Sequence, residues 1–430
     1  KQGIVQDLNR NSMLGALSHI RRLITPLAAG SKTIGPRKLH GSQWGFVCPT
    51  ESPDGGNVGI VNHLSIISTI SFNILENGII ECLKDNDLLE LKDSINKDLY
   101  THSKVFMNGK LIGFHKEAEF LVKLLKLLKL NSIINIYTSI SWNIDLNEIY
   151  IYTDSGRIVR PILVLKYDKD GKKINDLIQG KNELLENWDK LIHGYLYGKE
   201  DVSVYSDDYY KQYLDDIKKK EDNYLEFLQE KASPIEYIDS TESEFLFIAK
   251  DIYSIDKDYT HCEIHSSLIL SPLALQIPFP EHSQFPRNVF SCQQTKQAVG
   301  VYSSAYNTRF DTFGHVLSYP QKALVTTRYK KYTNVDKLPN GENIVVAICS
   351  YLGYNQEDSI MVNKSSIDRG MFNSMYFRSY EDNEEVNKSN NTSFFSNPNQ
   401  MKNNKIKNID AYSKLNNDGI VDEGTYVKYG

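Results

Sequence analysis

The sequence predicts an α+β fold built from several domains, and three observations predict it. A chain of 430 residues exceeds one ordinary core, since domains average roughly 150 residues, so we expect two to four units. Hydrophobic residues make up 40% and charged residues 24%, which is globular usage, and no run approaches the ~20 apolar residues of a membrane span. Strand-type and helix-type patterns also alternate between residues 101 and 165.

The segment 101–165 predicts a compact α+β module. In KVFMNGKLIGFH an Asn-Gly pair separates two strand-like runs, which indicates a β-hairpin. Two strands, EIYIYTDSG and RIVRPILVL, follow a helical run, EAEFLVKLLKLLKL. That helix is expected to face the core, because the alternative of a membrane-surface helix lacks aromatic anchors. Its leucines are predicted to form one stripe with the lysines off it: Leu121, Leu124, Leu125 and Leu128, and Lys123, Lys126 and Lys129.

The other segments differ in residue composition and in hydrophobic pattern. Residues 1–70 begin with a short helical run, MLGALSHIRRL, and continue as a Gly- and Pro-rich loop. Residues 166–256 carry helical runs with an acidic face, across 176–192 and 209–230. From residue 257 short strand-like runs and turns predict a mainly β unit, and the Asn-rich tract 383–410 is typical of a linker or a mobile loop.

The net charge of −5 is unevenly distributed. Residues 1–62 sum to +4 and residues 257–372 to +2, whereas residues 63–256 sum to −10. The outer segments therefore keep cations that can meet phosphate. Arg21, Arg22 and Arg37 lie near flexible Gly-rich backbone and are candidates for such contacts, with a solvated loop as the alternative.

Cysteine and histidine usage argues against a structural zinc site within this segment. The five cysteines are scattered and never spaced as CxxC, which predicts free, mostly buried thiols in a reducing compartment. HCEIH, residues 261–265, is not HExxH and has no third ligand cluster nearby, so we predict a structural turn there. The opening KQGIVQDLNR has no signal-peptide core and no initial Met, which indicates a trimmed chain or a fragment.

Two stretches carry candidate chemistry. In GYNQEDSI, residues 353–360, Glu357 and Asp358 follow the apolar run IVVAI. Carboxylates in apolar surroundings are costly unless they are paired or face a cation, so this stretch predicts a cationic partner. In PRNVFSCQQTKQAVG, Arg287, Lys296 and Gln297 lie beside strand-like and turn-like segments and suit a phosphate or a sugar edge, with surface salt bridges as the alternative.

Seven stretches stand out in order between residues 18 and 372. They are SHIRRL (18–23), RKLHGSQWGFVCPTESPDGGNVGIVNHLS (37–65), IYTDSGRIVRP (151–161), THCEIHSSLIL (260–270), IPFPEHSQFPRNVF (277–290), TKQAVGVY (295–302) and GYNQEDSIMVNKSSIDRGMF (353–372). Together they resemble the second-largest, beta-like subunit of multisubunit DNA-directed RNA polymerases. GYNQEDS resembles the RNA polymerase II type more than types I and III, and HGSQWG with an Asn- and Lys-rich insertion is compatible with a homologue from a large DNA virus.

The resemblance implies five segments and a central fragment of the subunit. Upstream and downstream parts, including a clamp that would carry the zinc, are expected outside this chain. The segments are the C-terminal part of the fork (1–70), external domain 1 (71–165), external domain 2 (166–256), the first part of a hybrid-binding domain with a double-psi β-barrel (257–384) and the start of the wall or flap (385–430).

The resemblance also implies DNA-templated RNA synthesis by a complex. The chain would be inactive alone, because the largest subunit holds the main metal. Expected partners are the largest and other polymerase subunits, template DNA, the RNA:DNA hybrid and nucleoside triphosphates, with no membrane. Localisation would be nuclear for a cellular enzyme, and the host cytoplasm or virion for a viral one. The alternative function is a non-catalytic nucleic-acid-binding scaffold that keeps the fold.

Site roles follow from the resemblance alone. Asp358, beside Glu357, would help to hold a second Mg²⁺ shared with the largest subunit, which arrives with the nucleoside triphosphate. Arg287 would lie near the triphosphate of that nucleotide. Lys296 and Gln297 would lie near the RNA 3′ end. The cations of the fork, Arg21, Arg22 and Arg37, would bind nucleic acid, Arg37 beside the downstream DNA.

Overall fold

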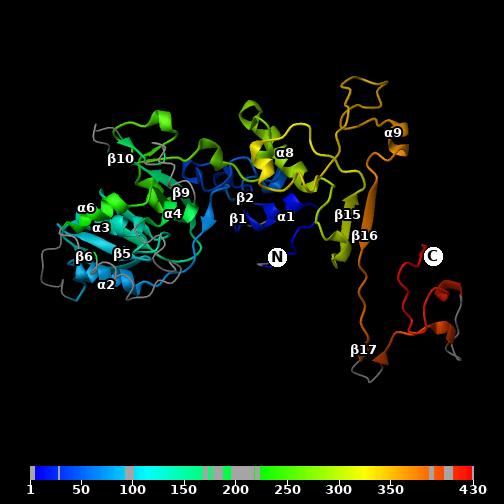
Figure 1. Cartoon of the computed structure of the whole chain (residues 1–430), viewed down its shortest axis with the longest axis horizontal. Coiled ribbons are helices and arrows are strands. Elements are labelled where there is room, and N and C mark those ends of the chain that lie inside the picture. Colours follow the sequence, from blue (N-terminus) through cyan, green and yellow to red (C-terminus); the bar gives the residue numbers. More distant parts are fainter. Residues whose placement is uncertain are drawn as a thin grey trace. The chain divides into compact units, whose positions relative to one another are not determined.

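The computed structural model contains several small sheets and mostly short helices (Figure 1). It describes residues 5–27, 30–92, 101–167, 173–175, 177, 187–194, 217, 223–386, 392–400 and 410–428. Residues 1–306 with 315–375 form one compact unit, and residues 307–314 with 376–430 form another. The mixed α and β content confirms the α+β prediction.

The elements are short because turns interrupt the chain often. The α-helices are α1 (Met13–Ile20), α2 (Asn77–Asp85), α3 (Ala118–Leu130), α4 (Trp188–Ile192), α6 (Tyr224–Lys231), α7 (Ser240–Glu244), α8 (Phe285–Gln297) and α9 (Lys364–Asp368). The strands are β1 (Arg22–Ile24), β2 (Val61–His63), β3 (Thr69–Ile70), β4 (Leu89–Glu90), β5 (Ser103–Met107), β6 (Lys110–His115), β7 (Ser139–Asn143), β8 (Glu148–Tyr152), β9 (Ile158–Val164), β10 (Lys166–Tyr167), β11 (Lys173–Ile174), β12 (Ile235–Asp239), β13 (Ile248–Ala249), β14 (His261–Cys262), β15 (Phe313–Leu317), β16 (Ser374–Arg378), β17 (Glu385–Val386) and β18 (Thr392–Ser393).

One five-stranded sheet has the order β4-β6-β5-β8-β7, in which β5 and β8 run parallel. The predicted hairpin joins β5 to β6, so it is confirmed. Asn108 and Gly109 at its turn have φ values of 48° and 78°, a left-handed backbone that Asn and Gly adopt readily. The predicted helix is α3, and its leucine stripe packs with α2, β5, β7 and β8 in one core.

Lys129 contradicts the prediction that it lies off the buried stripe. Its side chain is 1% exposed, and its Nζ donates to Glu242 Oε2 at 2.9 Å and to Glu236 Oε1 at 3.1 Å. Lys129 follows Leu125 by four residues, so helix geometry turns both to the same face. The two carboxylates make the buried ammonium tolerable. His261 Nε2 donates to the other oxygen of Glu236 at 3.0 Å and joins the cluster.

Glu242 makes the stability of this cluster depend on pH. Burial raises the pKa of Glu242 to about 7, Glu236 adds to the increase, and Lys129 opposes it. A carboxyl group whose pKa rises on folding contributes stability that is complete below its ordinary value of 4.5 and is lost as the pH rises to about 7. Because glutamine does not ionise, Glu242→Gln is expected to remove that part of the slope.

Denaturant unfolding between pH 5 and pH 7 measures this effect. The difference in unfolding free energy between the wild type and Glu242→Gln should change steadily over that range. Glu244→Gln, an exposed change on the same helix α7, is the control and should leave the slope unaltered. Parallel curves for the wild type and Glu242→Gln would show that Glu242 does not titrate there.

A second sheet has the order β12-β9-β14-β13, with β3 also paired to β9. It joins strands that come from four of the five segments proposed above. Arg160 of β9 is 1% exposed and donates to Glu263 Oε2 at 2.6 Å, while its guanidinium lies over the Phe46 ring. Trp44 Nε1 donates to the other oxygen of Glu263 at 3.1 Å. These contacts attach the loop before β2 to the sheet.

The structure corrects three predictions in the later part of the chain. The stretch expected to be strand-like and turn-like around Arg287 and Lys296 is the helix α8. His261–Cys262 is a strand rather than a turn. The run 344–348 forms no strand with any described residue, so this part of the predicted β unit is not formed in the structure. A strand needs a neighbouring strand to pair its N–H and C=O groups. The described residues provide no such neighbour for this run.

Some of the other expectations are confirmed, and some concern residues that the structure does not describe. The predicted helical start is α1, and four of the five thiols are buried, with Cys349 exposed. The helical runs predicted across 176–192 and 209–230 lie largely outside the described residues, but α4 and α6 confirm the helical C-terminal part of each run. Much of the tract 383–410 also lies outside the described residues. No helix in the described part of the chain is long and apolar enough to cross a membrane.

Candidate functional site

A polar pocket of about 340 Å³ lies beside the end of helix α8. Amide side chains dominate its lining, together with one guanidinium, one imidazole and one ammonium group. Amides can donate and accept, and the cations favour anions, so the pocket suits a polar, negatively charged ligand. Its lining residues are Gln6, Asn9, Asn11, Arg22, Ile24, Pro53, Asn57, Val61, His63, Gln293, Lys296 and Gln297.

Local structure brings these distant residues together. Ser12 caps α1 by accepting from Gly15 N at 2.9 Å, and its hydroxyl also donates to the Lys296 carbonyl at 3.0 Å. Strands β1 and β2 pair antiparallel, which sets Arg22 opposite His63. Helices α1 and α8 are in contact. The pocket is therefore built from the start of the chain, the paired strands β1 and β2 with the loop before β2, and α8.

A buried charge cluster lies beside the pocket and includes two of its lining residues, His63 and Lys296. Lys296 Nζ lies 3.0 Å from Glu51 Oε1, and Ser18 donates to the same oxygen at 2.6 Å. Burial alone would raise the pKa of Glu51, but His63, Lys296 and the Ser18 hydroxyl hold it below its ordinary value. Burial lowers the pKa of His63 to about 4, so its imidazole is neutral at pH 7. The ion pair at neutral pH is thus between Glu51 and Lys296.

Arg22 is the pocket cation that remains available. Among the described residues, its guanidinium has no carboxylate partner within ion-pair distance, and its Nε is buried with no hydrogen-bond acceptor. Burial lowers the pKa of Arg22, with Glu51 opposing, and an arginine stays charged at neutral pH. An unpaired guanidinium in a polar pocket is suited to a phosphate or carboxylate ligand.

Arg21 and Arg37 use their guanidinium groups within the chain. Arg21 donates to the carbonyls of Ser65 and Ser68. Arg37 donates to Ser31 O at 2.6 Å and to Gly56 O at 2.7 Å, and thereby joins two loops. Gly59, with φ 73°, packs so closely on the backbone of Arg37 that an added Cβ would lie 2.4 Å from its carbonyl oxygen. Both arginines organise loops in this chain.

The remaining predicted site residues lie at the surface. Arg287 is exposed in the first turn of α8, and its guanidinium lies 5.5 Å from the Phe290 ring. Glu357 and Asp358 are exposed on a turn, with φ 56° at Glu357. The expectation of apolar surroundings is wrong for this chain, because the neighbouring apolar side chains are exposed as well, Val345 fully and Ile348 by 98%. Neither carboxylate is paired with a cation among the described residues.

The structure therefore brings together only part of the predicted set. Arg22, Lys296 and Gln297 share one pocket, whereas no described contact joins them to Arg287, Glu357 or Asp358. No group of three or more His, Cys, Asp or Glu side chains in the described ranges is arranged to hold a metal ion. Sequence reasoning missed Glu51 and His63, because their partner Lys296 lies more than 200 residues away.

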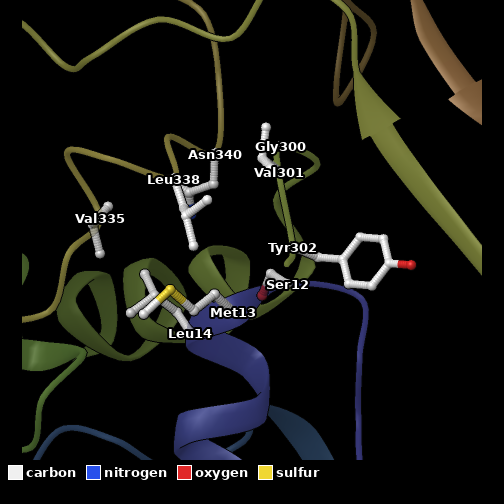
Figure 2. A pocket seen from close by; sticks show the side chains of 9 residues that line it. All are labelled: Ser12, Met13, Leu14, Gly300, Val301, Tyr302, Val335, Leu338 and Asn340. Atoms are coloured by element: carbon white, nitrogen blue, oxygen red, sulfur yellow. The ribbon is translucent and has the colours of Figure 1, made fainter. Parts of the chain in front are cut away.

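Two other hollows are less suited to a ligand. Figure 2 shows one between the start of α1, the segment after α8 and the loop around Val335. Its volume of about 10 Å³ is no larger than one water needs. A wider hollow of about 480 Å³ includes Arg157, but this guanidinium already pairs with Asp154 at 3.0 Å and with Asp239 at 3.1 Å. The pocket beside α8 is the better candidate.

Three family models match this chain. They are described as RNA polymerase Rpb2 domain 3, over residues 6–70, domain 4, over residues 105–166, and domain 6, over residues 273–430. Together they match more than half of the chain. The segments that build the pocket beside α8 fall within the matches to domains 3 and 6.

Curated relatives match along nearly the whole chain. The DNA-directed RNA polymerase II subunit RPB2 of Encephalitozoon cuniculi is 35% identical over 427 residues, which cover 99% of this chain and 35% of that protein. The DNA-directed RNA polymerase II subunit 2 of Arabidopsis thaliana is 35% identical, with 99% and 34% covered. The DNA-directed RNA polymerase subunit Rpo2 of Sulfolobus acidocaldarius is 35% identical, with 88% and 31% covered. The chain spans about a third of the length of these relatives.

Proposed function

Since this chain belongs to the Rpb2 family of second-largest subunits of DNA-directed RNA polymerases, we propose that it forms the central part of such a subunit and acts in DNA-templated RNA synthesis. The observation that carries the proposal is a similarity that covers 99% of the chain and matches three separate domains of that subunit. In this proposal the chain works only within a complex, with the largest subunit and other polymerase subunits as partners.

The pocket beside α8 is proposed to receive RNA of the RNA:DNA hybrid. Arg22 supplies a cation for one phosphate, and the exposed amide of Gln297 supplies hydrogen bonds to a sugar or a base edge. Lys296 lies in the wall of the pocket, where its ammonium group pairs with Glu51. Orientation of the RNA 3′ end in this way would favour in-line attack on the incoming nucleotide.

Asp358 is proposed to hold the Mg²⁺ that enters with the nucleoside triphosphate. Exposed carboxylate oxygens fit this ion, because Mg²⁺ binds through one or two carboxylates together with substrate phosphates. The ion would neutralise charge that develops on the leaving pyrophosphate. Asp358 and Glu357 would supply anionic oxygens, and Arg287, also exposed, would bind the triphosphate through its planar guanidinium.

Residues 257–384 are proposed to be the first part of the hybrid-binding domain, with its double-psi β-barrel completed by chain outside this sequence. The exposed apolar side chains of the run 344–348 support this proposal, since an unpartnered apolar strand buries its surface when other strands pair with it. For the other four segments the proposal keeps the boundaries predicted from the sequence. They are the fork (1–70), external domain 1 (71–165), external domain 2 (166–256) and the start of the wall or flap (385–430).

Primer extension tests the proposed function. A complex reconstituted with the full-length subunit should extend an RNA primer on a DNA template and should require Mg²⁺. Omission of the subunit is the control and should abolish extension. An assembled complex that binds the primer and template but adds no nucleotide in the presence of Mg²⁺ would contradict the polymerase function and favour the scaffold alternative.

A further inference from the structure

Lys296 and Arg22 both line the pocket, but only Lys296 has a carboxylate partner among the described residues. Lys296 is 7% exposed, and its Nζ is 3.0 Å from Glu51 Oε1 and 3.3 Å from His63 Nε2. The ammonium group thus has two partners inside the chain. Arg22, which also lines the pocket, has no such partner among the described residues.

His63 fixes the direction of these hydrogen bonds. Its Nδ1 lies 2.9 Å from the backbone carbonyl of Glu51, which can only accept, so Nδ1 carries the hydrogen. In the neutral imidazole Nε2 is then an acceptor, and it takes a hydrogen from Lys296 Nζ. Glu51 therefore holds Lys296 in two ways. Its carboxylate pairs directly with the ammonium group, and its backbone carbonyl orients His63, which accepts a hydrogen bond from the same group.

The backbone of Lys296 is fixed as well. The Ser12 hydroxyl donates to the Lys296 carbonyl at 3.0 Å, and Figure 2 shows Ser12 at the start of α1. The next residue, Gln297, ends α8 and is exposed to the pocket. The contacts that hold Lys296 at both ends therefore also hold the backbone from which the Gln297 side chain extends.

We propose that Glu51 is a positioning residue that holds Lys296 as an internal cation, so that Gln297 and Arg22, and not Lys296, contact the nucleic acid. This inference rests on the proposed function of the pocket. A cation neutralised inside the protein releases no counterions when nucleic acid binds, whereas Arg22 does. The pocket then provides one net positive charge for one phosphate, and its amides read the sugar or base edge.

Salt dependence of binding tests the assignment in the assembled polymerase with the full-length subunit. Binding of a synthetic RNA primer annealed to template DNA is measured against salt concentration. Glu51→Gln frees Lys296, so the slope of log K against log salt should become steeper by about 1. Arg22→Gln should make it shallower by about 1. Glu119→Gln, an exposed change on α3, is the control and should leave the slope unchanged.

A double variant keeps the test valid if a lone buried charge impairs folding. Glu51→Gln combined with Lys296→Gln leaves no buried charge and is expected to assemble with the wild-type slope. A slope shallower than wild type by about 1 in this double variant would show that Lys296 already binds phosphate, and would overturn the proposal.

Extension kinetics test the positioning role itself. Gln297→Ala and Glu51→Gln should each slow single-nucleotide extension by roughly 10- to 100-fold, and their combination should be no slower than either alone, because they act through one contact. Lys296→Arg, which keeps the cation, should restore much of the rate that Lys296→Gln loses. If the rate defects of Gln297→Ala and Glu51→Gln multiply in the combined variant, the positioning role of Glu51 is overturned, but the proposed function of the pocket is not. A wild-type complex that extends no primer would overturn the proposed function and this inference with it.

Discussion

Lys129→Met is expected to destabilise the chain by about 3–5 kcal/mol, because it leaves two carboxylates buried without their cation. Glu236 and Glu242 are 3% and 1% exposed, so water cannot replace the lost ammonium group. The pKa of Glu236 lies well below its ordinary value, since Lys129 and the His261 hydrogen bond outweigh burial. Removal of Lys129 also removes the largest opposing influence on the raised pKa of Glu242.

Denaturant unfolding and hydrogen exchange at the α3 amides measure the loss. Lys123→Met on the same helix is the matched control, because Lys123 is exposed and its replacement should change the free energy of unfolding by less than about 0.5 kcal/mol. A triple variant, Lys129→Met with Glu236→Gln and Glu242→Gln, removes the stranded charges and should recover part of the stability. Equal effects of the two lysine changes would mean that the buried ion cluster does not stabilise the fold.

Asp358→Asn is expected to slow nucleotide addition by roughly 100-fold in the assembled polymerase, which corresponds to about 2.7 kcal/mol in the barrier. The substitution keeps the size of an exposed side chain, so assembly should persist. It removes an anionic oxygen that we propose for Mg²⁺, and a neutral amide binds this ion poorly. The Mg²⁺ concentration for half-maximal rate should therefore rise.

Single-nucleotide addition measured over a range of Mg²⁺ concentrations separates these effects. Asp368→Asn is the control, since Asp368 is an exposed carboxylate ten residues further along. It should leave both the rate and the Mg²⁺ dependence unchanged. If Asp358→Asn behaves like this control, the proposed role of Asp358 is wrong, whatever the lineage of the chain.

Elements whose contacts are local could be predicted from the sequence. The β5–β6 hairpin depends on its own Asn-Gly turn, and α3 on the spacing of its leucines. Helix α8 was missed because its surface is polar, although Val289, Cys292 and Lys296 occur at spacings of three and four and are all buried. This spacing was the available signal for a helix.

Contacts between distant residues could not be predicted. Lys129 was placed off the stripe because a lysine is rarely buried alone, and its partners lie more than 100 residues away. The candidate pocket could not be predicted for the same reason, because it also depends on contacts between distant residues. Arg22, Lys296 and Gln297 were identified as separate candidates, but their meeting depends on Glu51, Ser12 and the β1–β2 pairing.

Strand β9 also has a consequence for synthesis of the protein. Its seven residues, IVRPILV, pair with β3, which precedes it, and with β12 and β14, the last of which ends at Cys262. A ribosome must therefore release about a hundred further residues before β9 has all its neighbours. During that interval this apolar strand lacks part of its pairing, and unpaired strand edges of this kind are prone to aggregation.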